Sequence, residues 1–170
     1  MNRKMKILIT SGSFGSHDPR HLEMLKQAGF EITRNPYGRL LNEEELTELL
    51  HDKDAVILST DRLTEKVIDS CDRLKVVSRY GTGINTVDVE ALKKRGIHLE
   101  IAYGANSEAV ADHAVGLMLD VAHNITLTNR YWHEGKFRKR PGTDLFGSKV
   151  GIIGLGAIGK GIARRLKGFK

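Results

Sequence analysis

The feature that most constrains the fold of this chain is a regular alternation of short apolar runs with amphipathic segments across residues 5–102. Each apolar run has the length of a buried strand, and each amphipathic segment repeats its apolar residues at helical spacing. The predicted strands are 5–10, 30–35, 54–59, 74–81 and 97–102, and the predicted helices are 21–29, 42–51, 64–71 and 87–96. Such an alternation favours a parallel sheet with helices over both of its faces.

Residues at the ends of the predicted helices support these boundaries. Asn42 and Glu45 have the spacing of a capping box, in which each side chain hydrogen-bonds to the backbone of the other residue. Thr64 is placed to cap the helix that follows it, and Gly29 and Gly96 are helix-stop residues. For this pattern we expect a flavodoxin-like α/β fold whose five parallel strands lie in the order 2-1-3-4-5.

The second half of the chain follows a different pattern. Residues 106–125 are predicted to form one long and largely buried helix. A basic, turn-rich connecting segment comes next, with a short helix expected around Arg130. The run KVGIIG at 149–154 is predicted to be a buried strand that leads into a final helix. We therefore expect a flavodoxin-like domain, 1–103, followed by 104–170, which would hold the long helix and the first strand–helix unit of an incomplete Rossmann domain.

Composition excludes several classes of function. The net charge is +6, and residues 129–170 contain 11 Lys and Arg against 2 Asp and Glu, but no interleaved aromatic residues support nucleic-acid binding. No apolar run is long enough for a membrane span, and the N-terminus is interpreted as a first strand rather than a leader. The single cysteine, Cys71, is compatible with a cytoplasmic location. The seven histidines lack metal-ligand spacing, so no metal site is predicted.

A glycine motif near the C-terminus indicates dinucleotide binding. Gly154, Gly156 and Gly159 match G-x-G-x-x-G between an apolar run and a predicted helix. The first glycine permits the tight turn, the second admits a pyrophosphate, and the third allows close packing of helix and strand. The acidic residue that usually follows about 20 positions later, to bind the ribose, is absent from this chain.

Two further glycine loops follow predicted strands, where open α/β sheets bind ligands. In the loop after 74–81, Gly81 and Gly83 free backbone N–H groups to face an anion, and Arg79 is placed to clamp a carboxylate. A flexible loop with an exposed arginine explains the same residues equally well. The other loop, 11–15, has the glycine and serine content of a phosphate loop but lacks a Walker pattern, and it is interpreted as a turn near the ligand cleft.

Four longer motifs in order resemble the D-isomer-specific 2-hydroxyacid dehydrogenase family, and nearest its phosphoglycerate-type members. They are NPYGRLLNEEEL, VVSRYGTGINTVDVEAL, GANSEAVADHAVGLML and EGKFRKRPGTDLFGSKVGIIGLGAIG. The resemblance implies an NAD-dependent enzyme that oxidises a D-2-hydroxy acid, with or without a phosphate group, to a 2-keto acid. It also implies that Gly81, Thr82 and Gly83 bind the substrate carboxylate and that Thr82 approaches the nicotinamide. Ala157 and Ile158 would contact the pyrophosphate through their backbone.

The resemblance also sets limits on this chain. The catalytic Arg, Glu and His of the family have no counterpart in these 170 residues, so no catalytic residue is assigned and the chain by itself is expected to be inactive. Two alternatives stay open: a non-catalytic flavodoxin-like fragment, or an anion-binding module. The long helix and the run at 149–154 would expose apolar faces if left alone. Either the final strand–helix unit adds to the edge of the sheet, or two chains exchange helices and strands, and of these we expect the homodimer.

Overall fold

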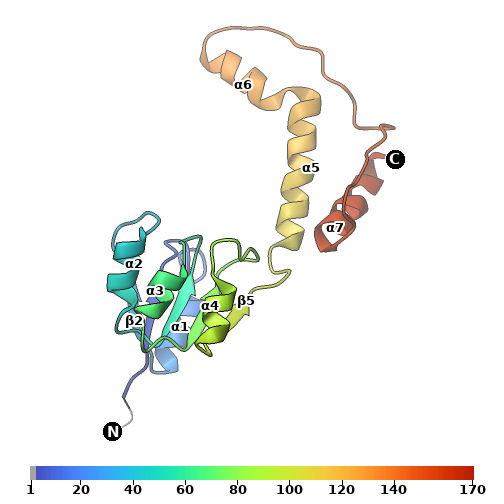
Figure 1. Cartoon of the computed structure of the whole chain (residues 1–170). Helices are drawn as coiled ribbons and strands as arrows, with labels where there is room; N and C mark the ends of the chain where they lie inside the picture. The colour runs from blue at the N-terminus through green and yellow to red at the C-terminus, as the bar shows by residue number, and fades with distance from the viewer. Residues whose placement is uncertain (1–2) are drawn as a thin grey trace. The chain divides into compact units, whose positions relative to one another are not determined.

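The computed structural model describes residues 3–170, which divide into two compact units. One unit ends at Tyr103, and the other runs from Gly104 to Lys170. In Figure 1 the first unit is coloured from blue to yellow-green and the second from yellow to red. The two units differ in architecture, since only the first contains a sheet.

The N-terminal unit is a five-stranded, all-parallel sheet with four helices, which confirms the predicted fold and strand order. The sheet order is β2-β1-β3-β4-β5, and every neighbouring pair is parallel. The strands are β1 (Lys6–Ile9), β2 (Glu31–Arg34), β3 (Ala55–Leu58), β4 (Val76–Arg79) and β5 (His98–Ile101). The helices are α1 (Arg20–Gln27), α2 (Glu43–Leu50), α3 (Glu65–Asp69) and α4 (Val89–Lys94).

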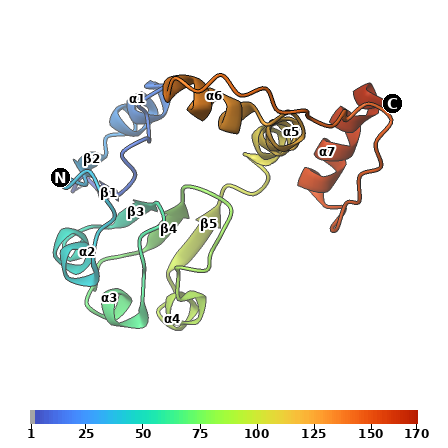
Figure 2. The ribbon, with the colours of Figure 1, turned by 90° about the horizontal axis from the view of Figure 1, so that it is seen from above.

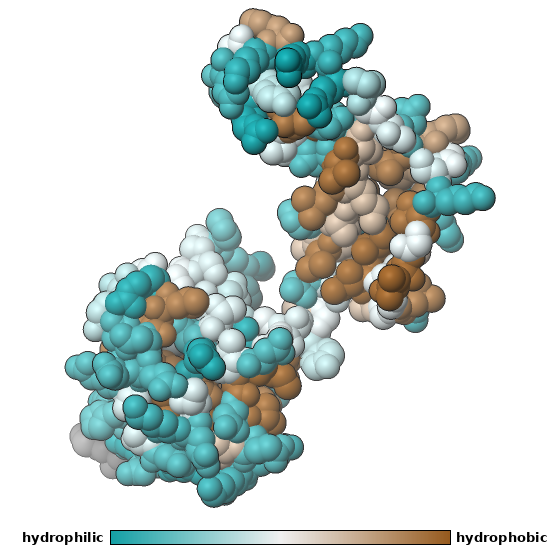
Figure 3. Space-filling view, turned by 45° about the horizontal axis from the view of Figure 1, so that its top comes forward, coloured by the Kyte–Doolittle hydropathy of each residue, from teal (hydrophilic) through white to brown (hydrophobic). Residues whose placement is uncertain are grey.

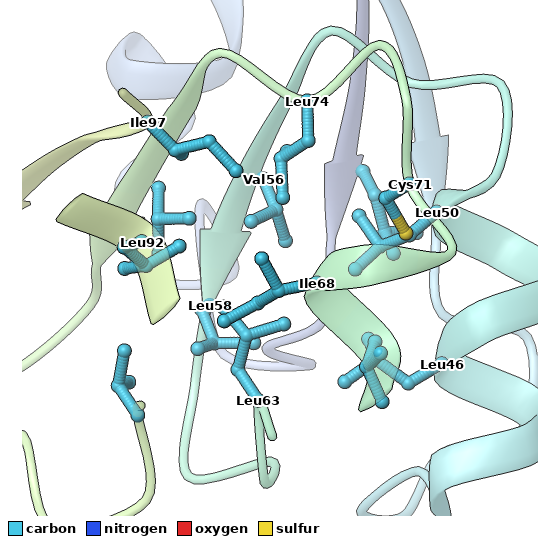
Figure 4. Packing of buried hydrophobic residues seen from close by; sticks show 14 of the residues in the cluster. Leu46, Leu50, Val56, Leu58, Leu63, Ile68, Cys71, Leu74, Leu92 and Ile97 are labelled. Carbon is cyan, nitrogen blue, oxygen red and sulfur yellow. The ribbon is translucent and has the colours of Figure 1, made fainter. Parts of the chain in front are cut away.

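The two faces of this sheet are covered unequally. Figure 2 shows α2, α3 and α4 together on one face and α1 on the other. The main core fills the face under the three helices, where side chains of β1, β3 and β4 meet those of α2, α3 and α4 (Figure 4). Its fully buried members include Leu8, Leu46, Val56, Ile68 and Val77. By contrast α1 buries none of its residues, so the opposite face is covered more thinly.

Helix capping agrees with the sequence at one site and differs at another. The Asn42 side chain accepts a bond from the Glu45 N–H, and the Glu45 carboxylate accepts one from the Asn42 N–H, as in the predicted capping box. Thr64 occupies the N-cap position of α3, but its hydroxyl is buried without a partner among the described residues. The predicted position of Thr64 at the start of this helix is therefore confirmed, although its hydroxyl makes no capping bond.

The C-terminal unit consists of helices without a sheet. Its elements are α5 (Ser107–His123), α6 (Ile125–His133), α7 (Ala157–Leu166) and the 3-10 turn η1 (Lys167–Phe169). The short helix expected around Arg130 is α6, which begins after Asn124 in the left-handed conformation, with φ 54°. The long predicted helix is α5, and α7 packs against it.

Two predictions for the C-terminal unit were wrong. Residues 149–154 form no strand, because no described segment pairs with them and an isolated strand leaves its backbone polar groups unpaired. The Rossmann unit is therefore present as a turn and a helix only. In addition, α5 is not largely buried, since only Ser107 and Ala111 are buried along it and Val121 is 80% exposed. Figure 3 shows the resulting apolar surface of this unit in brown.

Candidate functional site

The first candidate site is the loop at the carboxyl end of β4. A backbone hydrogen bond of 2.9 Å from the Gly81 N–H to the Arg79 carbonyl turns the chain sharply after the strand. Gly81 has a φ of 141°, a conformation that residues with a side chain rarely adopt. Thr82 and Gly83 follow, and both are exposed. The loop therefore presents backbone rather than bulky side chains at the edge where open parallel sheets bind ligands.

Arg79 has a different orientation from the one we expected. The residue is 6% exposed, and its Nε donates a hydrogen bond of 2.6 Å to the Gly83 carbonyl. Its Nη1 donates to the carbonyls of Leu58 and Ser59 at the end of β3. Arg79 thus holds the β4 loop against the β3 end, and Nη2 is its one terminal nitrogen without an acceptor among the described residues. Its use as a clamp on a carboxylate stays a prediction.

The backbone N–H groups of Thr82 and Gly83 in this loop are free. Within residues 3–170, neither Thr82 nor Gly83 donates its amide proton to a protein acceptor. A pair of unpartnered amides on a loop that is held by a buried arginine is suited to binding a carboxylate, since charge-assisted hydrogen bonds are stronger than neutral ones. Tyr80 packs edge-on against Phe14, with ring centroids 5.5 Å apart, and this contact joins the loop to the segment after β1.

The second candidate site is the glycine turn before α7, which lies in the C-terminal unit. Gly154 has a φ of 93°, and Gly156 is the N-cap residue of α7 with no side chain to cap it. A Cβ added at Gly159 would clash with the Gly154 carbonyl oxygen, so the third glycine is required by close contact. The first-turn amides of Ala157, Ile158 and Gly159 lack intrahelical acceptors by their position. These donors, with the positive end of the helix dipole, suit an anionic group.

Ion pairs hold α7 against α5, and the sequence interpretation missed them. Arg165 donates from Nε to Asp112 at 2.5 Å and from Nη1 to Glu108 at 2.8 Å, and Arg164 also pairs with Glu108. Where the helices cross, a Cβ at Gly161 would lie 2.9 Å from the Ala111 Cβ. Nothing in the spacing of these residues indicates the contact, because the pairs join positions more than 50 residues apart.

These ion pairs shift the ionisation of the groups involved. Hydrogen bonds from Arg165 and then from Arg164 lower the pKa of Glu108 below its ordinary value. The bond from Arg165 likewise lowers the pKa of Asp112, and the two carboxylates raise the pKa of Arg165. All three side chains stay ionised near neutral pH. Because Asp112 is occupied by Arg165, it is not paired with its neighbour in sequence, His113.

Two other kinds of feature are missing from the described part of the chain. In residues 3–170, no group of three or more His, Cys, Asp or Glu side chains is arranged to hold a metal ion. Over the same residues, no helix has the length and apolar character needed to cross a membrane.

A sequence profile described as D-isomer specific 2-hydroxyacid dehydrogenase, catalytic domain, matches residues 7–161. The chain therefore belongs to the D-isomer-specific 2-hydroxyacid dehydrogenase family, as its motifs suggested.

Individual relatives extend this finding. The chain is 36% identical over 168 residues to a D-3-phosphoglycerate dehydrogenase of Methanocaldococcus jannaschii, covering 97% of this chain and 30% of that protein. It is 31% identical over 158 residues to a glyoxylate reductase of Pyrococcus furiosus, covering 87% of this chain and 47% of that protein. The chain thus spans 30% to 47% of the length of these curated relatives.

Solved structures agree with the fold. The TT0316 protein of Thermus thermophilus superposes with a TM-score of 0.84 at 30% identity, over 97% of this chain and 53% of that one. An NAD-dependent formate dehydrogenase of Staphylococcus aureus, solved with NAD, superposes with a TM-score of 0.81 at 26% identity, over 97% and 54%. Nearly the whole of this chain is therefore similar to about half of each of these proteins.

Proposed function

We propose that these 170 residues form the substrate-binding domain and the first cofactor-binding turn of an NAD-dependent oxidoreductase that oxidises a D-2-hydroxy acid to a 2-keto acid. Family membership supports the reaction class. The observation that carries the substrate role is the pair of free amides at Thr82 and Gly83 on a loop held by Arg79. In this proposal the two amides bind the substrate carboxylate, and Gly81 sets the turn that presents them.

The glycine turn before α7 fits the pyrophosphate of NAD. The close contact at Gly159 and the uncapped helix N-terminus are the features that support this assignment. Gly154 and Gly156 would allow the approach of the cofactor, and the amides of Ala157 and Ile158 would donate to its phosphates. Bound NAD would accept the hydride that leaves C2 of the hydroxy acid. By resemblance, Thr82 would also approach the nicotinamide end of the cofactor.

Within this class we propose a phosphorylated substrate. The segment Lys136–Arg140 contains four cations, of which only Lys136 has a carboxylate partner among the described residues, Glu134 at 2.8 Å. Arg140 and Arg130 both lie over the ring of Tyr131, at 5.9 Å and 5.8 Å from its centroid. Exposed arginines without a counter-ion are suited to a phosphate group. The similarity to a D-3-phosphoglycerate dehydrogenase supports the same substrate class.

The test is a residue-resolved NMR titration of the full 170-residue chain with 3-phosphoglycerate, D-glycerate and NAD in separate arms. We expect both acids to shift the amide resonances of Thr82 and Gly83, with the phosphorylated acid binding more tightly, and NAD to shift those of Ala157 and Ile158. Cofactor binding should be weak, because the chain has no ribose-binding acid after the turn. If neither acid perturbs Thr82 or Gly83, the proposed function is wrong.

A matched pair of variants sharpens this test. Gly81→Ala places a Cβ on a residue with φ 141° and should distort the turn, weakening acid binding about tenfold. Gly116→Ala is the control, because a Cβ there meets nothing within 4 Å and the residue lies outside both glycine turns. Equal binding by both variants would contradict the role given to this turn.

We further propose that the chain self-associates through its C-terminal unit. Val121 and Leu117 line one surface hollow along α5 and are 80% and 51% exposed, and Ile153 is 105% exposed; soluble chains rarely leave large apolar patches in water. Light scattering should give a homodimer. Val121→Lys should shift it toward monomer, whereas Met24→Lys, on the exposed α1, should not. A monomeric unmodified chain would contradict this proposal.

A further inference from the structure

Asp61 is a buried carboxylate that the proposed function does not use. It follows β3 and is 1% exposed. Its Oδ2 accepts a hydrogen bond of 2.5 Å from the Thr10 hydroxyl, and its Oδ1 accepts one of 2.8 Å from the Leu41 N–H. None of the ion pairs within residues 3–170 includes Asp61. Because a buried carboxylate without a cation is costly unless other donors bind it, Asp61 depends on these two donors and fixes their positions.

The Thr10 hydroxyl connects Asp61 to the segment that follows β3. It donates its proton to Asp61, and its oxygen accepts a hydrogen bond of 2.8 Å from the Ser59 N–H. The backbone N–H of Thr10 donates to the Ile57 carbonyl at 3.0 Å. Thr10 is 4% exposed, so little water reaches these bonds. The position of the backbone at Ser59 is therefore set by Thr10 and, behind it, by Asp61.

Ser59 in turn positions Arg79. The Ser59 carbonyl accepts a hydrogen bond from Arg79 Nη1, and the Leu58 carbonyl accepts one of 3.1 Å from the same nitrogen. From its other side, Arg79 donates through Nε to the Gly83 carbonyl. Like Asp61, Arg79 takes part in no ion pair within residues 3–170, so backbone carbonyls hold its guanidinium. A shift of the Ser59 carbonyl would therefore move Arg79, and the Gly83 peptide with it.

The location of these bonds favours a role at the loops over a role in the sheet. The ladder between β1 and β3 ends at Ile9 and Ile57, and the ladder between β3 and β4 ends at Leu58 and Arg79. The bonds that Asp61 accepts lie beyond these ends, where no strand pairing fixes the backbone. They therefore extend the order of the sheet into the loops that follow it.

We propose that Asp61 and Thr10 are positioning residues for the acid-binding loop, a role that rests on the function proposed above. The bonds form one network, here called the Asp61 network, whose members in order are Asp61, Thr10, Ser59, Arg79 and Gly83. Neither Asp61 nor Thr10 contacts the substrate in this role. They fix the carbonyl that holds Arg79, and Arg79 holds the loop. Donors fixed in advance bind a ligand more tightly, because less entropy is lost on binding.

The experiment is an NMR titration of the 170-residue chain with D-glycerate, read at the amides of Thr82 and Gly83. D-Glycerate carries a carboxylate without a phosphate, so the readout is confined to the acid-binding loop. Thr10→Val keeps the approximate size of the side chain but removes the hydroxyl, and it should weaken binding about tenfold. Thr10→Ser keeps a hydroxyl and should bind within about twofold of the unmodified chain. Asp61→Asn replaces one acceptor oxygen with a donor and should weaken binding as Thr10→Val does.

A stability control separates positioning from a general loss of structure. Leu50 is the last residue of α2, on the side where β3 begins, and it is fully buried in the main core. Leu50→Ala should lower the urea midpoint at least as much as Thr10→Val does, yet bind D-glycerate within about twofold of the unmodified chain. In the ligand-free chain, Thr10→Val should also shift the Arg79 Nε–H resonance, and Leu50→Ala should leave it in place.

The outcomes distinguish this inference from the proposed function. If D-glycerate leaves the Thr82 and Gly83 amides of the unmodified chain unchanged, the proposed function fails and this inference fails with it. If the unmodified chain responds and Thr10→Val binds equally well, the proposed function stands and the positioning role is overturned. Equal weakening by Thr10→Val and Leu50→Ala would also overturn it, because affinity would then follow stability rather than the position of the loop.

Discussion

Each unit of this chain contains an apolar run of similar composition, but only the run in the N-terminal unit forms a strand. In the N-terminal unit the run at 54–59 becomes β3, between β1 and β4, and Val56 is fully buried. In the C-terminal unit the run at 149–154 forms no strand, and Ile153 is 105% exposed. An apolar run becomes a strand only where neighbours accept its backbone hydrogen bonds and helices cover its side chains. The N-terminal unit thus has a covered hydrophobic core, whereas the C-terminal unit has a pair of helices joined by ion pairs and by the close contact of Gly161 with Ala111.

The largest expected effect concerns activity, which requires more than the binding turns of either unit. We expect no measurable NADH oxidation by the 170-residue chain with phosphohydroxypyruvate. An acid–base group contributes typically about 10²–10⁴-fold to a rate, and no residue here matches the catalytic set implied by the family resemblance. A spectrophotometric assay of NADH absorbance measures this directly. Turnover above a heat-denatured control would refute the assignment of no catalytic residue.

Two leucines on helices test whether the units differ in packing as described. Leu46 on α2 is fully buried, and Leu46→Ala should lower the free energy of unfolding by about 2–5 kcal/mol. Leu117 on α5 is 51% exposed in the single chain, and Leu117→Ala, measured at a concentration at which the chain is monomeric, should change it by no more than about 0.5 kcal/mol. Urea unfolding followed by circular dichroism compares the two. Similar losses would mean that the C-terminal unit has a core of its own.

Gly159→Ala tests whether the turn before α7 is closely packed, as the contact at this glycine indicates. The added Cβ would clash with the Gly154 carbonyl oxygen, and relieving this contact should cost about 1–3 kcal/mol of local stability. Hydrogen exchange of the α7 amides is the measurement. Gly151→Ala serves as the control, because a Cβ there meets nothing within 4 Å. Unchanged exchange in Gly159→Ala would show that the turn rearranges freely.

The smallest expected effect is a difference in acid sensitivity. Hydrogen bonds from Lys53 and then from Lys6 lower the pKa of Asp52, in the N-terminal unit, to about 2. A carboxyl whose pKa is lower in the folded chain stabilises the fold above its ordinary pKa of 3.8, and this contribution is lost as the pH falls toward 2. Asp52→Asn should therefore reduce the change in the free energy of unfolding of this unit between about pH 4 and pH 2.

In the C-terminal unit, acidification should weaken the contact between α5 and α7. Glu108 and Asp112 have lowered pKa values because of Arg165, so acidification below their ordinary range removes the attraction. Arg165→Gln should remove this pH dependence from the α7 resonances in an NMR acid titration, while leaving that of Asp52 unchanged. If the variant and the unmodified chain titrate alike at α7, ion pairs do not hold the helices together.

The sequence was most informative where local pattern and tertiary surroundings agree. The strands and helices of the N-terminal unit, their parallel order and the Asn42–Glu45 capping box all follow from periodicity and spacing, because each run in this unit finds the neighbours that its pattern anticipates. The glycine turn at 154–159 was likewise predictable, since its φ values and close contacts are requirements of the turn itself.

Tertiary structure alone decided the rest. Local sequence could not show that Arg79 would turn inward to the carbonyls of Leu58, Ser59 and Gly83, because its hydrogen-bond acceptors come from another strand and from the loop's own fold. It could not show that α5 would stay exposed or that 149–154 would lack a partner, because burial depends on what surrounds a segment. Periodicity fixes which face of an element is apolar, whereas only the assembled neighbours determine whether that face is covered.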